Sequence, residues 1–435
     1  MRGAGDLDHR WDTLGFAVIA AAIILFALFA KRLENTVITP PLVFAAFGLI
    51  IGESVLGWAD LKFENSFVHG LAEITLILVL FSDAARIDLS LLRQDHNLPV
   101  RMLLIGMPLV IVFGTIAALA LPLGFSFWEA ALLAAILAPT DAALGQSVVS
   151  SRFVPLRIRQ TLNVESGLND GIALPFVLIF AFLAGATQAG SEHGWLLFGA
   201  KQVILGPLAG VIVGGGGARL LDTASKKGWT TEAYEGPAIL GLAFLAYSGS
   251  ELIGGNGFIA AFVSGLVFGN FVRGRCGFVF EFAEAEGNFL VLVTFLIFGA
   301  AILPTTVGAI DWTVLLYAVL SLTAIRMIPI ALSLIGSGVR GSTVAFLGWF
   351  GPRGLASILF ALFILEEVPV PAGEHIAVIT VVTVAMSIVL HGLTAAPLSR
   401  LYGDRVARMG GAEEMKPVSE MPMRGGSAHK EPRAP

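Results

Sequence analysis

The stretch LLAAILAPTDAALGQ at residues 132–146 decides the fold, because an apolar helical pattern is interrupted at its centre by PTD (139–141). A second stretch, FLGWFGPRGLASILF at residues 346–360, repeats this design with GPRG (351–354) at its centre. Proline removes a backbone donor and glycine loosens a helix. Both stretches therefore predict a helix that is broken inside apolar surroundings.

The two breaks carry opposite charges. A broken helix leaves free N–H groups at one end and free carbonyl groups at the other, with partial charges to match. We expect Asp141 to offset the positive helix ends and Arg353 the negative ones. Two unrelated proline kinks are the alternative. The matched positions and opposite charges favour one arrangement in which the breaks face each other.

The composition requires a bilayer around these helices. The chain of 435 residues is 56% hydrophobic and 14% charged, whereas soluble domains contain roughly 25% charged residues. We therefore predict an all-α polytopic membrane protein. The net charge of −5 and the lack of basic clusters give no reason to expect nucleic acid as a partner. Cys276 is the only cysteine, which excludes an intrachain disulfide. We expect a transporter, not an enzyme, and no cofactor.

Thirteen stretches are long and apolar enough to be spanning helices. They lie near 14–30, 40–58, 67–84, 99–121, 127–150, 161–184, 196–221, 236–252, 256–272, 287–304, 312–335, 343–365 and 375–397.

Basic residues gather in alternate loops, as the positive-inside rule requires of one topology. The basic-rich loops contain Lys31, Arg32, Arg86, Arg93, Arg101, Arg152, Arg157, Arg159, Arg219, Lys226, Lys227, Arg273, Arg275, Arg340, Arg400, Arg405 and Arg408. The opposite set contains Arg2, Arg10, Lys62 and Lys201. We expect an extracytoplasmic tail at 1–13, a retained first helix and a disordered cytoplasmic tail at 403–435. The expected location is the bacterial inner membrane.

The broken stretches are the fifth and the twelfth spans, which suggests two six-helix repeats of inverted topology on either side of a seventh helix. Secondary transporters often have this design, with the binding site at unwound helices in equivalent positions. In the seventh span, Gly206, Gly210 and Gly214 predict a face for close helix packing.

Charged residues inside spans are functional candidates, because a charge at mid-bilayer costs roughly 2.5–3.5 kcal/mol even on insertion scales. In the span 161–184, Glu165 and Asn169 lie four residues apart, as do Ser166 and Asp170, so the helix presents an acid on two adjacent faces. Arg326, deep in the span 312–335, needs a partner, and we assign it to Glu165 as a structural ion pair.

That assignment leaves Asp170 as the candidate for both ions. A buried carboxylate has a raised pKa and can hold either a proton or a metal ion. Na⁺ prefers oxygen ligands. The Asp170 carboxylate, the Ser166 hydroxyl and carbonyl groups freed at Thr140 are the expected ligands. Helix–helix contact or a capping role is the structural alternative for Asp170.

The span 67–84 contains a further acid, Glu73, which either joins the ion site or forms a salt bridge near the outer face. At the cytosolic end of that span, Asp83, Arg86 and Asp88 are expected to line an entrance or to form surface pairs.

PTD at 139–141, ESGLND at 165–170, Arg326 and GPRG at 351–354, taken together and in order, resemble the NhaP/NHE-type monovalent cation:proton antiporters. The resemblance covers nearly the whole chain. It implies roles for individual residues: ion and proton binding for Asp170, ligands or neighbours of the site for Ser166, Asn169, Thr140, Asp141 and Glu73, a stabilising pair for Glu165 and Arg326, and helix compensation for Arg353.

The resemblance also implies a homodimer in which a core domain moves like an elevator against a scaffold. Within an antiporter domain at 14–402, helices 4–6 and 11–13 would form the core, helices 1–3 and 8–10 the scaffold, and helix 7 a linker. Electrogenic relatives carry a second Asp at the position of Asn169, so electroneutral exchange is expected here. A K⁺/H⁺ exchanger, an organic-anion symporter and an ion channel are the alternative readings. The sequence contains no repeated pore filter for a channel.

Overall fold

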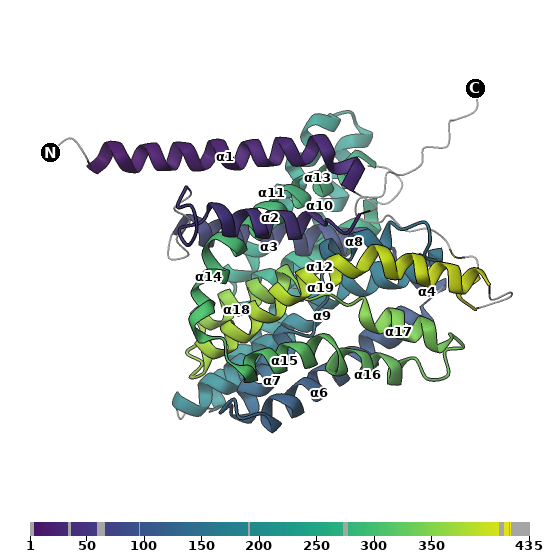
Figure 1. Cartoon of the computed structure of the whole chain (residues 1–435). Coiled ribbons are helices and arrows are strands. Elements are labelled where there is room, and N and C mark those ends of the chain that lie inside the picture. The colour runs from purple at the N-terminus through teal and green to yellow at the C-terminus, as the bar shows by residue number, and fades with distance from the viewer. Residues whose placement is uncertain are drawn as a thin grey trace.

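The structure is a computed structural model, and it describes residues 4–33, 36–58, 66–94, 96–189, 192–272, 277–408, 413–416 and 418. Every regular element within these ranges is a helix (Figure 1). The prediction of an all-helical protein is therefore confirmed for the part of the chain that the structure describes.

The first half of the chain contains both long and short helices. Its elements are α1 (Ala4–Leu33), α2 (Pro40–Ile51), α3 (Ser66–Arg86), α4 (Leu89–Gln94), α5 (Asn97–Arg101), the π-helix η1 (Met102–Gly106), α6 (Met107–Ala120), α7 (Phe127–Ile136), α8 (Ala142–Val149), α9 (Leu156–Ala189) and α10 (Glu192–Lys226).

The last long helix of the second half is α19, and a short 3₁₀ helix follows it. Its elements are α11 (Glu232–Leu252), α12 (Gly257–Val272), α13 (Gly277–Ile297), the π-helix η2 (Phe298–Ile302), α14 (Leu303–Thr306), the 3₁₀ helix η3 (Val307–Ala309), α15 (Trp312–Leu322), α16 (Ala324–Ser333), α17 (Gly341–Trp349), α18 (Leu355–Glu367), α19 (Gly373–Ala407) and the 3₁₀ helix η4 (Glu413–Met415).

Six helices in the described ranges are long and apolar enough to cross a membrane. They cover Asn97–Ala120, Leu156–Gly185, Gly199–Lys226, Gly287–Ala309, Trp312–Ser333 and Gly373–Ala407. The shorter apolar helices include α7, which ends where the PTD break begins, so α7 and α8 are two halves of one predicted span. The span 343–365 is divided in the same way into α17 and α18.

The helices at both ends of the described structure extend past the spans 14–30 and 375–397 that the sequence predicts. The helix α1 begins at Ala4, within the expected tail 1–13. At the other end, α19 continues to Ala407, and η4 follows, so the stretch from 403 is not disordered throughout. The reason is an apolar stripe at the end of α19, where Tyr402 and Val406 are buried against the body of the protein. The prediction of disorder rested on the many Gly, Pro, Glu and Met residues of this stretch, and that composition does not reveal the stripe.

The helices pack so that backbones approach closely at glycine. On α10, a Cβ added at Gly210 would lie 2.6 Å from the Ala260 carbonyl oxygen of α12, and one at Gly214 would lie 2.5 Å from the Ser264 carbonyl oxygen. This contact matches the close-packing face predicted for the seventh span. The helix α12 also packs against α3, and α1 lies along the edge of the bundle (Figure 1).

Candidate ion-binding site

The two interrupted helices meet at their breaks. Residues 137–141, between α7 and α8, and residues 350–354, between α17 and α18, have no helical structure. The two segments are joined by a backbone hydrogen bond in which the Asp141 N–H donates to the Pro352 carbonyl oxygen at 2.8 Å. Four half-helix ends therefore lie around one point inside the protein.

Asp141 caps two helices at once. Its Oδ1 accepts the Leu144 N–H of α8 at 2.9 Å, and its Oδ2 accepts the Leu355 N–H of α18 at 2.7 Å. A carboxylate at a helix N-terminus satisfies free donors and offsets the positive end of the helix dipole. There is no room for a side chain at Gly354, where an added Cβ would overlap the Asp141 carboxylate. The glycine thus allows the carboxylate to reach both helices.

Arg353 binds free carbonyl groups at the C-terminal end of a half-helix. Its Nη1 donates to the Ala138 carbonyl at 2.8 Å and to the Pro139 carbonyl at 3.2 Å, which lie just past the end of α7. The Arg353 backbone N–H donates to Ser387 Oγ of α19 at 2.7 Å. The guanidinium is fully buried. A cation against free carbonyls offsets the negative end of a helix.

A buried ion pair lies beside the crossing. Arg326 Nη2 of α16 is 2.6 Å from Glu165 Oε1 and 2.8 Å from Glu165 Oε2 of α9. The side chains are 2% and 3% exposed, so water solvates neither charge. An added Cβ at Gly351 would meet the Arg326 guanidinium, so the pair packs directly against the second broken segment.

Thr140, Ser166 and Asn169 form a small hydrogen-bonded group beside the pair. Thr140 Oγ1 and Ser166 Oγ lie 3.0 Å apart, and Asn169 Nδ2 donates to Thr140 Oγ1 at 2.6 Å. The Thr140 carbonyl oxygen lies farther from the same Nδ2, at 3.4 Å. The amide of Asn169 therefore holds the break of the first helix against α9.

Asp170 lines a small cavity next to this group, together with Asp141 and Asp83. The remaining walls come from Leu76, Val79, Ala142, Val291, Leu355 and Ala356. The cavity volume is about 10 Å³, which is room for about one water molecule. All three carboxylates are mostly buried, each in a residue that is 8% exposed. Their convergence on a water-sized space suits a small cation that has lost most of its hydration shell.

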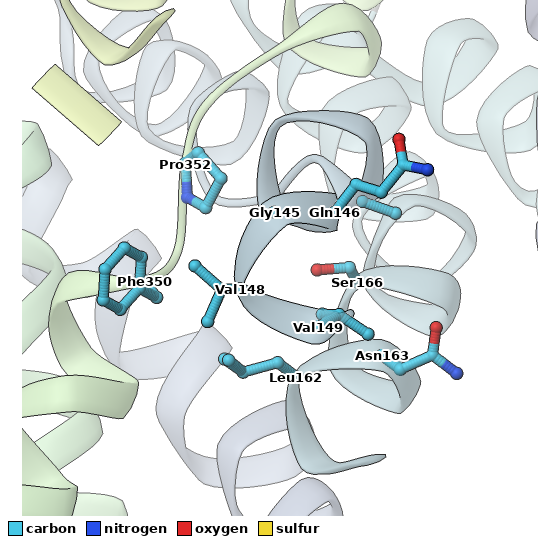
Figure 2. Close-up of a pocket in the computed structure, with 10 residues that line it drawn as sticks. Gly145, Gln146, Val148, Val149, Leu162, Asn163, Ser166, Phe350 and Pro352 are labelled. Carbon is cyan, nitrogen blue, oxygen red and sulfur yellow. The ribbon is translucent and has the colours of Figure 1, made fainter. Parts of the chain in front are cut away.

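A second cavity of similar size opens between α8 and α9. Figure 2 shows Gln146, Asn163 and Ser166 on these helices, with Phe350 and Pro352 of the broken segment opposite. Ala142 lines both cavities, so both spaces border the start of α8. Ser166 thus faces the second cavity, whereas Asp170 faces the first.

The structure brings most of the residues singled out in the sequence to one place, but it separates Glu73 from them. Glu73 is half-buried on α3 and does not line the Asp170 cavity. Asp83 of the same helix does, ten residues further along, which is about 15 Å on an α-helix. Sequence reasoning assigned Asp83 to an entrance or to surface pairs. The signal that was missed is a second acid inside α3, which continues to Arg86.

Three carboxylates line the Asp170 cavity, but in the described ranges no three His, Cys, Asp or Glu side chains lie close enough together to hold one metal ion. The hydroxyl groups of Thr140 and Ser166 and the amide of Asn169 belong to the adjoining hydrogen-bonded group, and none of these three residues lines the Asp170 cavity.

Comparison with known proteins identifies the family of this chain. Residues 18–401 match the transmembrane domain of the sodium/hydrogen exchangers, and the chain belongs to this family. The family defines a class of membrane proteins that exchange monovalent cations for protons.

Characterised relatives include the K⁺/H⁺ antiporter NhaP of Alkalimonas amylolytica, 27% identical over 92% of this chain and 69% of the relative. The Na⁺/H⁺ antiporter 2 of Zygosaccharomyces rouxii is 25% identical over 87% of this chain and 51% of the relative. The K⁺/H⁺ antiporter NhaP2 of Shewanella oneidensis is 26% identical over 88% and 66%. The chain thus spans half to two-thirds of the relatives' length.

The fold matches that of the sodium proton antiporter MjNhaP1 from Methanocaldococcus jannaschii. The TM-score is 0.74 at 22% identity, over 90% of this chain and 98% of that one.

Proposed function

We propose that this chain exchanges Na⁺ or Li⁺ for H⁺, one for one, and that Asp170 carries the cation and the proton in turn. The observation that supports this most directly is the cavity shared by Asp170, Asp141 and Asp83 beside the crossing of the two broken helices. In this arrangement both Asp141 oxygens accept backbone N–H groups, so its charge is committed to the helix ends. Asp170 is then the acid on which the two ions compete.

We propose oxygens of the neighbouring hydrogen-bonded group as additional cation ligands, although Ser166 lines the second cavity and not the Asp170 cavity in this structure. Ser166 Oγ and Thr140 Oγ1 lie within one hydrogen-bonded group, and Asn169 belongs to the same group. Na⁺ is hard and binds such neutral oxygens together with a carboxylate. Asp83 replaces Glu73 as the proposed contribution of α3 to the site. Glu165 and Arg326 are proposed to stabilise the core, and Arg353 to compensate the helix ends.

An elevator mechanism is supported by the origin of the cavity walls. Leu76, Val79 and Asp83 belong to α3 and Val291 to α13, within the proposed scaffold. Asp141 and Asp170, with the other lining residues, belong to the proposed core. A site between two bodies is exposed alternately to the two sides when one body slides against the other.

The wider architecture remains part of the proposal. It comprises thirteen spans in two inverted repeats, a homodimer, an N-terminus outside and a C-terminus inside the bacterial inner membrane. The six spans of the first repeat correspond to α1–α9, the six spans of the second repeat correspond to α11–α19, and α10 is the linker between them.

K⁺ is the second candidate cation, because two of the relatives carry the name K⁺/H⁺ antiporter. The deciding measurement is proton flux from acid-loaded proteoliposomes after addition of Na⁺, Li⁺, K⁺ or Ca²⁺. An exchanger releases protons when its own cation is added, and the order of potency ranks the cations. Proton release that no cation alters would reject the proposed activity.

The role of Asp170 is tested with Asp170→Asn. Burial of an amide costs less than burial of a charge, so the variant is expected to fold and to elute as a single species. It should give no exchange from pH 6 to 8.5. In the wild type, apparent Na⁺ affinity should weaken as pH falls, by up to about tenfold per pH unit below the carboxyl pKa. A folded Asp170→Asn protein with near wild-type exchange would move the site to Asp141 or Asp83.

A further inference from the structure

The short helix η4 near the end of the chain docks on the body of the protein through a buried carboxylate. Glu414 is 1% exposed, whereas its neighbour Met415 is 60% exposed. Glu414 Oε1 accepts the Arg340 backbone N–H at 2.9 Å and the Thr343 hydroxyl at 2.7 Å. A buried carboxylate is stable only with such partners, so this contact fixes η4 at one place.

That place is the beginning of half-helix α17. Arg340 is the N-cap residue of α17, and its own side chain makes no capping hydrogen bond. Glu414 therefore supplies from a distant part of the chain the acceptor that the helix lacks. Its negative charge also lies at the positive end of the helix dipole.

Contacts continue from this cap to the ion site. The Tyr402 hydroxyl lies 2.9 Å from Thr343 Oγ1, and because Thr343 donates to Glu414, Tyr402 donates to Thr343. The Tyr402 ring is stacked on Phe346, with centroids 4.2 Å apart and planes 18° apart. Phe346 contacts Phe350 at 4.6 Å between centroids. Phe350 begins the segment whose Pro352 carbonyl binds Asp141.

A second contact anchors the segment of η4 to α9. Arg157 Nη1 is 2.9 Å from Glu413 Oε2 and 2.8 Å from the Glu413 carbonyl oxygen. Arg157 is in the first turn of α9, the helix that also bears Asp170. The segment 413–414 thus joins the outer ends of the two elements that meet at the proposed ion site.

We propose that Glu414 is a positioning residue for cation exchange, because it caps α17 and thereby sets where the segment 350–354 lies against Asp141 and the Asp170 cavity. This inference rests on the proposed ion site. It assigns to residues 413–414 a part in cation affinity, although neither residue lines the Asp170 cavity.

The test compares Glu414→Ala with Glu414→Gln and with the matched control Met415→Ala in proteoliposomes. The readout is the Na⁺ concentration that gives half-maximal proton release. Glu414→Ala should raise this concentration about tenfold, as expected for a lost charge-assisted hydrogen bond to the backbone. Glu414→Gln keeps an acceptor oxygen and should give a smaller rise. Met415→Ala should give none.

A merely structural role predicts a different result. It would lower the folded fraction and the maximal rate together, and it would leave the half-maximal concentration unchanged. If folded Glu414→Ala protein has the wild-type half-maximal concentration, or if Met415→Ala raises it equally, the inference is wrong.

Tyr402→Phe provides a variant that retains the ring stacking and loses only one hydroxyl. If Glu414→Ala does not fold, this variant and Glu414→Gln decide, and wild-type values in both would overturn the inference. The wild type and Asp170→Asn are measured in parallel. Absence of cation-driven proton release in the wild type would reject the proposed function. Wild-type release with unaltered Glu414 variants would reject only the positioning role.

Discussion

The ion pair between Arg326 and Glu165 offers the sharpest test of how the core is held together. Arg326→Met leaves Glu165 buried without its partner, and Glu165→Met does the same to Arg326. Loss of one partner of a buried pair costs roughly 3–5 kcal/mol. Arg326 Nε is buried and has no hydrogen-bond partner among the described residues. Part of the cost of burying this guanidinium is therefore already present in the wild type, and we expect about 3 kcal/mol for each single variant.

The double variant Arg326→Met/Glu165→Met separates pairing from simple loss of side chains. Two apolar residues of similar volume remove both buried charges, so the double variant should be more stable than either single variant. The expected coupling energy is about 2–3 kcal/mol. The assay is thermal unfolding in detergent at one fixed scan rate, because unfolding of membrane proteins is often irreversible and the midpoint then depends on the rate.

Two results would refute this reasoning. Additive losses in the double variant would mean that the two residues do not act as a pair. A fully stable but inactive Arg326→Met protein would move this arginine from the structural role into transport. We expect instead that the folded yield of the single variants falls more than their apparent affinity for the cation changes.

Three further predictions concern the helix caps, the charge balance and acid. Asp141→Ala removes one cap from each of α8 and α18, and each lost cap costs about 0.5–2 kcal/mol of stability. The thermal unfolding midpoint of Asp141→Ala should therefore fall further than that of Asp141→Asn. Equal midpoints in the two variants would argue against the double cap. Asn169 cannot titrate, so Asp170 is the one titrating acid of the adjacent residues 169 and 170. Clamping the membrane potential with valinomycin and K⁺ should therefore leave the Na⁺/H⁺ exchange rate unchanged, provided that K⁺ is not itself a substrate. A clear dependence of the rate on the potential would indicate a second titrating acid. Hydrogen bonds from Lys416 and Arg157 hold the pKa of Glu413 below 4.5, and burial acts to raise the pKa of Glu414 but the Arg340 N–H and the Thr343 hydroxyl outweigh it. The stability that the two carboxylates contribute is therefore fully present above pH 4.5 and is lost as the pH falls below that value, so the gap in thermal midpoint between wild type and Glu414→Gln should narrow in acid.

The broken helices could be predicted from the sequence, because proline, glycine and opposite charges act locally. The partnership of Glu165 and Arg326 was predicted because a buried guanidinium needs an acidic partner. The contribution of Asp83 could not be predicted in this way. Which acid of α3 reaches the cavity depends on the depth of α3 relative to α8 and α9, and this depth is set by packing between helices far apart in the sequence.

The docking of Glu414 was beyond sequence reasoning for a similar reason. The stretch around it is rich in charge and glycine, which is typical of an unstructured tail. Its partners, Arg340 and Thr343, lie 74 and 71 residues away. Only the arrangement of α17 and α19 brings them together, and no local pattern in the tail indicates it.

The double cap by Asp141 also has a consequence for how the protein is made. Asp141 and its second hydrogen-bond donor, the Leu355 N–H, are 214 residues apart, and Arg353 is 215 residues from the Ala138 carbonyl. During synthesis, α7 and α8 enter the membrane long before either partner exists. Contacts of such long range form late in folding. The contacts between the two broken helices therefore form only after Leu355 has left the ribosome. Until then Asp141 can cap only α8, while the first broken helix lies in the membrane or in the insertion machinery.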